Sequence, residues 1–287
     1  MRIDRAAIPA YAASLAAAAY VPGLDPETHF LGDPGPTAGY ILTLDAINFG
    51  SGYFPHLRRR DQRSGYFHVA RALKARWERV GPLAPAELAQ ITIPECRAIF
   101  DQPAEGPAGE LMGLFAAALN AFGRHLLERH GGDFEQLMAA AGGSAERMAG
   151  LLAEVPFFDD VHDYRGLRVP LYKRAQIAGA DLHLAVGGFH DLERLTVFAD
   201  NLVPHVLRLD GVLAFDSALA GRIERGELIG SGSEEEVEMR ACAVHAVELI
   251  KGHTGRTAME LDHLLWNRGQ GPRYKARPRP RCRTVYY

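Results

Sequence analysis

Helical periodicity is the sequence feature that most limits the folds open to this chain. In the segment that ends at Gly131-Gly132, apolar residues recur at spacings of three and four, as on one face of an α-helix. This face is formed by Leu111, Leu114, Phe115, Ala118, Phe122 and Leu126. The pattern predicts a long amphipathic helix in the middle of the chain.

Start and stop signals predict further helices on both sides of this segment. Each begins at a residue typical of helix N-termini, and three of the four end near a glycine. These helices are 145–155 with Ser144 as N-cap, 171–186 with Pro170 in the first turn and Gly187-Gly188 at the end, 234–251 with a Ser233–Glu236 capping box and Gly252 at the end, and 258–268 with a Thr257–Glu260 capping box and Gly269 at the end.

Strand signals are few, and they lie at 39–47 and 195–199. No fixed-period repeat and no long Ser/Gly linker divides the sequence. We therefore predict a mainly α fold, a single helical domain over residues 1–287 with at most a few short strands. It includes an N-terminal helix over residues 1–24 and a basic C-terminal arm at 270–287.

Composition narrows the function. The chain has 287 residues, 47% of them hydrophobic, and a net charge of −3, which is typical of a soluble globular protein and indicates neither a nucleic acid nor a membrane as partner. Its three cysteines are far apart, as in proteins of a reducing compartment. The alanine-rich N-terminus is interpreted as a helix and not as a signal peptide. We expect a cytoplasmic protein.

Common catalytic motifs are missing. The sequence contains no P-loop, GxGxxG, HExxH or GxSxG motif. Two His-Asp dipeptides, His162-Asp163 and His190-Asp191, are weak evidence for a metal-dependent HD-type phosphohydrolase, because no spacing indicates the additional ligands. We expect no metal, and this phosphohydrolase remains an alternative function.

Three aspartates lie within apolar sequence: Asp45 in "ILTLDAINF", Asp200 in "TVFADNLVP" and Asp262 in "MELDHLLW". Any one of them could cap a helix or pair with an arginine. Together they favour a pocket for acid–base chemistry or for a cation. Trp266 shares a helical face with Asp262 and could stack on a flat ring.

Lys173 and Arg174 fall in the first turn of a predicted helix, where a cation is disfavoured by about 0.3–1 kcal/mol. Two cations there suggest a nearby anion. The anion is either a carboxylate of the protein or a bound phosphate.

Several blocks together resemble one known family. "ILTLDAINF", "SGYF", "YKRAQIAGAD", "LTVFADNLVPHVL", "EVEMRACAVHAVELI", "LDHLLW" and the terminal "YY" occur in the order found in the queuosine salvage protein family. The resemblance runs from about residue 25 to the C-terminus. It implies a helical fold distantly like that of DNA glycosylases. It also implies hydrolysis of the N-glycosidic bond of queuosine 5′-monophosphate to queuine and ribose 5-phosphate, without cofactor, for queuine salvage toward tRNA modification.

The resemblance also implies roles for individual residues. Asp200 is the catalytic carboxylate, which either stabilises the sugar as it becomes cationic or attacks the anomeric carbon. The implied queuine contacts are His29, Phe198, Ala199, Asp262, His263 and Asn267, with Asp45 and Trp266 less directly supported. Asn267 stands where the family pattern has an aspartate, so it can hydrogen-bond but cannot balance a cation. Lys173 and Arg174 are the candidates for the phosphate.

The arm "RYKARPRPRCRTVYY" (273–287) leaves three interpretations open. It could be a solvated tail, an arm that lies back on the domain through its aromatic end, or a segment that binds phosphate or RNA. A base- or tRNA-binding protein without catalytic activity is therefore a third candidate function, although we expect no stable nucleic acid complex.

Overall fold

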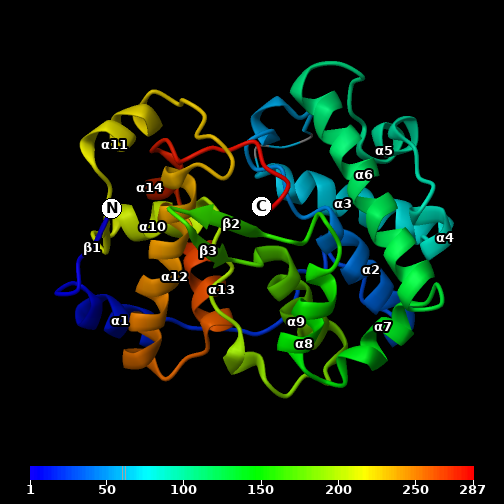
Figure 1. The fold of residues 1–287 in the computed structure, drawn as a ribbon, viewed down its shortest axis with the longest axis horizontal. Helices are drawn as coiled ribbons and strands as arrows, with labels where there is room; N and C mark the ends of the chain where they lie inside the picture. The colour runs from blue at the N-terminus through cyan, green and yellow to red at the C-terminus, as the bar shows by residue number, and fades with distance from the viewer. Residues whose placement is uncertain (60, 62) are drawn as a thin grey trace.

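The computed structural model describes residues 1–59, 61 and 63–287, and within these residues it is mainly helical (Figure 1). The elements in chain order are β1 (Arg2–Ile3), α1 (Ile8–Ala16), α2 (Pro34–Ala46), the 3-10 turn η1 (Phe54–His56), α3 (Gly65–Val80), α4 (Pro85–Leu88), α5 (Ile93–Phe100), α6 (Gly106–Arg129), α7 (Phe134–Ala141), α8 (Ala145–Ala153), β2 (Val161–Tyr164), β3 (Leu167–Pro170), α9 (Lys173–Val186), the 3-10 turn η2 (Leu192–Arg194), α10 (Leu202–Leu209), β4 (Leu213–Ala214), α11 (Ser217–Glu224), α12 (Glu234–Thr254), α13 (Ala258–Gly269) and α14 (Pro272–Lys275).

The predicted mainly α class is confirmed, with two small antiparallel pairs, β1–β4 and β2–β3, as the sheets of the described residues. The likeness to DNA glycosylases stays a prediction. Ser144 and Ser233 cap their helices as predicted, and Thr257 and Glu260 form the predicted capping box. These local signals hold because they depend on a few adjacent residues. The predicted Ser233–Glu236 box is incomplete, because the Glu236 side chain accepts from the Gly232 amide and not from that of Ser233.

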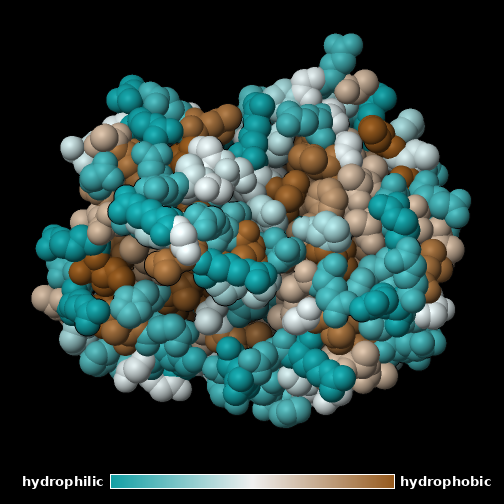
Figure 2. All heavy atoms as spheres, viewed as in Figure 1, coloured by the Kyte–Doolittle hydropathy of each residue, from teal (hydrophilic) through white to brown (hydrophobic). Residues whose placement is uncertain are grey.

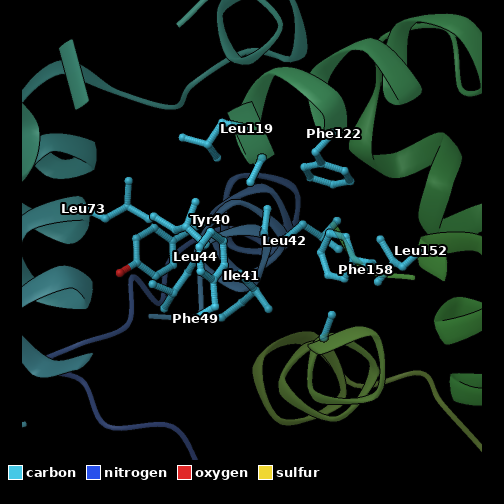
Figure 3. Packing of buried hydrophobic residues seen from close by; sticks show 14 of the residues in the cluster. Tyr40, Ile41, Leu42, Leu44, Phe49, Leu73, Leu119, Phe122, Leu152 and Phe158 are labelled. Carbon is cyan, nitrogen blue, oxygen red and sulfur yellow. The ribbon is translucent and has the colours of Figure 1, made fainter. Parts of the chain in front are cut away.

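Two groups of helices pack around separate apolar clusters. The first cluster is centred on α2 and α6 and includes Tyr40, Phe122 and Phe158 (Figure 3). The second cluster joins α1, α10, α12 and α13. Figure 1 shows these groups on opposite sides of the molecule, with the β2–β3 hairpin and the C-terminus between them. The side of the molecule seen in Figure 2 is mostly hydrophilic, with scattered apolar patches.

Both predicted strands are wrong. The run 39–47 lies almost entirely in helix α2, which begins at Pro34 and is buried on all sides from Thr37 to Ala46. A helix buried all round has the same continuous apolar run as a buried strand, so periodicity does not separate them. The segment 195–199 pairs with no strand of the described chain. Instead, the amides of Thr196 and Phe198 donate to the side chains of Gln176 and Asp262.

Three helix boundaries also differ from the prediction. The N-terminal helix ends at Ala16, so residues 17–24 form a loop. Pro170 ends β3, and α9 begins only at Lys173. Helix α12 runs past Gly252 to Thr254, because Gly255, in the left-handed conformation with a φ of 68°, forms its C-cap.

The C-terminal arm lies back on the domain, which is the second of the three interpretations given above. Cys282 and Tyr287 are buried, and the Tyr287 main-chain oxygen accepts from the amide of Gly50. At Gly52 an added Cβ would lie 2.2 Å from the Cys282 carbonyl oxygen, so the close approach of the arm requires a glycine. The arm therefore forms part of the wall between the two helix groups.

Candidate active site

A cavity of about 730 Å³ is lined by both helix groups. Its wall combines the loop before α2, the start of α3, one face of α9, the segment before α10, one face of α13 and the C-terminal arm. A cavity of this volume is suited to a drug-sized or nucleotide-sized ligand. Every residue predicted for the site lines this cavity except Ala199, Asp45 and Arg174.

Asp200 hydrogen-bonds the start of helix α10 and also lines the cavity. Its Oδ1 accepts from the amides of Leu202 (2.6 Å) and Val203 (3.1 Å), which are the first amides of α10. Among the described residues no other donor reaches this carboxylate, and the residue lines the cavity. One carboxylate oxygen thus fixes the orientation while the other is left for a ligand.

Lys173 is the first residue of α9 and lines the same cavity. Asp160 holds this helix start, because its Oδ2 accepts from the Lys173 amide at 3.1 Å. Tyr172 just before it is left-handed, with a φ of 46°, a strained conformation that turns the chain from β3 into the helix. The Lys173 Nζ lies 3.4 Å from the Asn48 carbonyl oxygen. Burial lowers the pKa of Lys173, and the nearby Asp200 charge opposes this shift.

Asp262 lies on α13, close enough to Asp200 for their charges to interact. Its Oδ1 accepts from the Phe198 amide at 3.1 Å, which also positions the backbone that leads to Asp200. Burial and then the Asp200 charge raise the pKa of Asp262 to about 8. Asp262 is therefore protonated at neutral pH, when it can donate a hydrogen bond as well as accept one.

His29 lies in the loop before α2 and is held from two sides. Its Nδ1 donates to the Asp25 carbonyl oxygen at 3.0 Å, which leaves Nε2 to accept from the Tyr66 hydroxyl at 3.3 Å. Burial lowers the pKa of His29, so the ring is neutral. His263 packs edge-on against Tyr20, with ring centroids 5.4 Å apart, and Asn267 is exposed at the rim.

Aromatic rings supply flat apolar walls. Trp266 lies 5.9 Å from Phe67 and 6.1 Å from Tyr66, measured between ring centroids. Phe198 is buried and also lines the cavity. Rings placed in this way can pack on both faces of a planar base.

Three predicted residues lie behind the wall and not in it. Arg174 is fully buried, and its guanidinium donates to the carbonyl oxygens of Asp45 (3.1 Å), Ala46 (2.7 Å) and Phe157. The bonds to Asp45 and Ala46 satisfy C-terminal carbonyls of α2. Ala199 faces the other way, and its carbonyl oxygen accepts from Arg240 at 2.8 Å. The sequence places these residues next to the site but does not reveal which way they point.

Asp45 also lies behind the wall. Its Oδ1 accepts from Asn48 at 3.2 Å, and its buried Oδ2 has no partner among the described residues. Burial raises the pKa of Asp45 to about 7.

The structure adds residues that the sequence analysis missed. Asp181, Tyr66, Lys275, Arg279 and Tyr287 all line the cavity. The Asp181 signal was its position eight residues after Lys173, on the same face of α9. The cations of the arm carried no such signal, because their approach depends on tertiary packing.

The two His-Asp dipeptides have separate structural contacts. Asp191 accepts from the Ser144 hydroxyl and the Ala145 amide at the start of α8. His162 hydrogen-bonds Asp160 at 2.9 Å. Within the described residues, no group of three or more histidine, cysteine, aspartate or glutamate side chains is arranged to hold a metal ion.

The fold and the cavity together define a mainly helical protein with a pocket lined by carboxylates, cations and aromatic rings. The comparison with family models gives the particular family. Residues 28–287 match the queuosine salvage protein model, and the chain belongs to this family.

Several relatives carry the name queuosine 5′-phosphate N-glycosylase/hydrolase. The protein of that name from Sphaerobacter thermophilus is 38% identical over 99% of this chain and 92% of its own length. The Dictyostelium discoideum protein is 32% identical over 88% of this chain and 78% of its own. The mouse protein is 29% identical over 87% of this chain and 81% of its own.

Proposed function

We propose that this chain hydrolyses the N-glycosidic bond of queuosine 5′-monophosphate and releases queuine and ribose 5-phosphate. The names and identities of the relatives support this activity. The observation that carries it is the Asp200 carboxylate, which is fixed through one oxygen and faces a nucleotide-sized cavity.

Asp200 acts on the sugar. Cleavage of an N-glycosidic bond passes through an oxocarbenium-like state, in which positive charge develops at the anomeric carbon. A carboxylate already oriented by two main-chain amides stabilises this charge without having to reorganise. Water then completes the hydrolysis on the sugar.

The base binds between the aromatic walls. We assign Phe198 and Trp266 to its faces and His29, Asp262, His263 and Asn267 to its polar edges. This assignment agrees with their positions around the cavity. Ala199 does not line the cavity. Its carbonyl oxygen accepts from Arg240, and this bond holds the backbone between Phe198 and Asp200 in place.

Asp262 supports departure of the base. A 7-deazapurine lacks N7, so it cannot be protonated at that atom as a leaving purine usually is. A protonated Asp262 next to the catalytic carboxylate is placed to donate a hydrogen bond to the base as negative charge develops on it. Two neighbouring carboxyl groups with different protonation states are a common acid/base arrangement.

The 5′-phosphate binds at Lys173. Arg174 does not bind the phosphate, because its guanidinium donates to main-chain carbonyl oxygens behind the cavity wall. Arg279 and Lys275 from the arm line the same cavity and supply further positive charge.

The proposed reaction needs no organic cofactor or metal, and its product queuine would serve tRNA modification. We place the protein in the cytoplasm and expect no stable complex with nucleic acid. The three free cysteines agree with a reducing compartment. No helix of the described residues has the length and hydropathy needed to cross a membrane.

The direct test is incubation of the purified protein with queuosine 5′-monophosphate, followed by mass spectrometry. We expect free queuine and ribose 5-phosphate in equal amounts, also in the presence of a chelator. Intact nucleotide after prolonged incubation would contradict the proposal. Release of inorganic phosphate with the base still attached, dependent on a divalent ion, would favour the HD-type phosphohydrolase.

A further inference from the structure

Asp181 is a carboxylate of the cavity that the mechanism above does not use. It lies on α9 in line with Lys173 and Ile177, and all three line the cavity. Eight residues of helix place the Asp181 backbone about 12 Å from that of Lys173. Asp181 is therefore farther along the pocket than the site at which Asp200 and Lys173 meet the sugar and its phosphate.

The surroundings of Asp181 lack any donor that would explain a carboxylate there. No hydrogen-bond donor among the described residues reaches its oxygens. Burial and then the neighbouring Asp45 charge raise the pKa of Asp181 well above its ordinary value, and the Lys173 charge opposes this rise only in part. A carboxyl group kept in this environment is destabilising unless a ligand compensates it.

The groups beside Asp181 are aromatic rings with hydroxyls. Tyr66 is close enough for the Asp181 charge to raise its pKa, after burial, and it packs edge-on against Trp266. Tyr20 lines the same region, and its buried hydroxyl has no partner in the described chain. An acid surrounded by aromatic faces is the composition that binds an alkylammonium group.

We propose that Asp181, together with Tyr20 and Tyr66, forms the subsite that binds the positively charged aminomethyl arm of the base and so selects bases that carry an ammonium there. The inference rests on the proposed function, because it takes its orientation from a sugar bound at Asp200. Asp262 already accepts from the Phe198 amide and lies beside Asp200, so it meets the ring of the base and not the arm.

The test compares two bases that differ in the charge of the arm. Binding of 7-aminomethyl-7-deazaguanine and of neutral 7-cyano-7-deazaguanine is measured by titration calorimetry. We expect the wild-type protein to prefer the aminomethyl base by about 10- to 100-fold, as for a hydrogen bond to a charged group. In Asp181→Asn the preference should fall to about threefold or less.

Two variants serve as controls. Asp159→Asn makes the same change at an exposed aspartate and should leave the preference unchanged. Asp181→Ser removes the carboxylate with a smaller side chain and should lose the preference as Asp181→Asn does. It takes the place of Asp181→Asn if that variant does not fold.

The outcomes separate this inference from the activity. If wild-type protein hydrolyses queuosine 5′-monophosphate but Asp181→Asn keeps the full preference for the charged base, the subsite is wrong and the activity stands. If wild-type protein neither hydrolyses the nucleotide nor binds either base, both proposals fail.

Discussion

Two clusters of buried charge lie close together in this molecule, and they are built differently. The Arg240 network consists of Arg240, Asp160, Glu236 and His162, and its charges are paired. Arg240 lies 2.5 Å from Asp160 and 3.3 Å from Glu236, and its ring neighbour is Tyr287 at 4.7 Å. Burial raises the pKa of Asp160, but the Arg240 charge and hydrogen bonds more than offset this, so the pKa lies well below its ordinary value.

The acidic group consists of Asp45, Asp181, Asp200 and Asp262, and its charges are poorly compensated. The donors that reach it from the described residues are main-chain amides and one asparagine. The pKa values of Asp45 and Asp262 are raised to about 7 and about 8, mainly by burial. The difference supports the proposal that the acidic group binds a cationic ligand, whereas the Arg240 network stabilises the fold.

The largest effect should come from breaking the Arg240 network. Arg240→Met leaves Asp160 and Glu236 buried without their counter-charge, so the free energy of unfolding should fall by about 3–5 kcal/mol. Urea denaturation measures this loss. Arg165→Met makes the same change in an exposed ion pair with Glu234 and should cost less than about 1 kcal/mol. Equal losses in the two variants would remove the structural role of the network.

A smaller effect is expected at the cation that faces the acidic group. Lys173→Ala should raise KM for queuosine 5′-monophosphate by about 10- to 100-fold and hardly change KM for the unphosphorylated nucleoside. Lys74→Ala, in an exposed ion pair with Glu78, is the matched control and should alter neither. Steady-state kinetics on both substrates provides the measurement. Similar losses on both would place the phosphate elsewhere.

The third prediction concerns how stability depends on pH. Because the folded-state pKa of Asp262 is raised to about 8, the native protein binds a proton there that the unfolded chain releases above about pH 4. The free energy of unfolding should therefore fall as pH rises from about 4 to 8. Asp262→Asn should weaken this dependence, seen in denaturation midpoints at pH 5 and pH 8. The control Asp159→Asn should keep the wild-type dependence of stability on pH. If Asp262→Asn also keeps it, the raised pKa of Asp262 is not its source.

The sequence predicts helices better than it predicts their surroundings. Caps such as Ser144 and the Thr257–Glu260 box depend on neighbouring residues, and the structure confirms them. Helix α2 was mistaken for a strand because burial on all sides erases its periodicity. The segment before α10 was mistaken for a strand because its amides are bound by side chains from distant helices.

The site residues also divide into those with a local sequence signal and those that depend on tertiary packing. The apolar context of Asp200 and Asp262 indicated a special environment, and both line the cavity. Arg174 carried the same signal as Lys173, yet its place one residue further along the helix directs it to the end of α2. The approach of Arg279 depends on the docking of the arm at Gly52, which no local pattern encodes.

The central claim concerns the uncompensated oxygen of Asp200, and single-turnover hydrolysis by Asp200→Asn tests it most directly. The asparagine oxygen can still accept from the Leu202 and Val203 amides, so the fold and the affinity for queuine should persist. The account predicts a loss of at least about 100-fold in the rate of queuosine 5′-monophosphate cleavage. A variant that keeps more than about a tenth of the wild-type rate would contradict it.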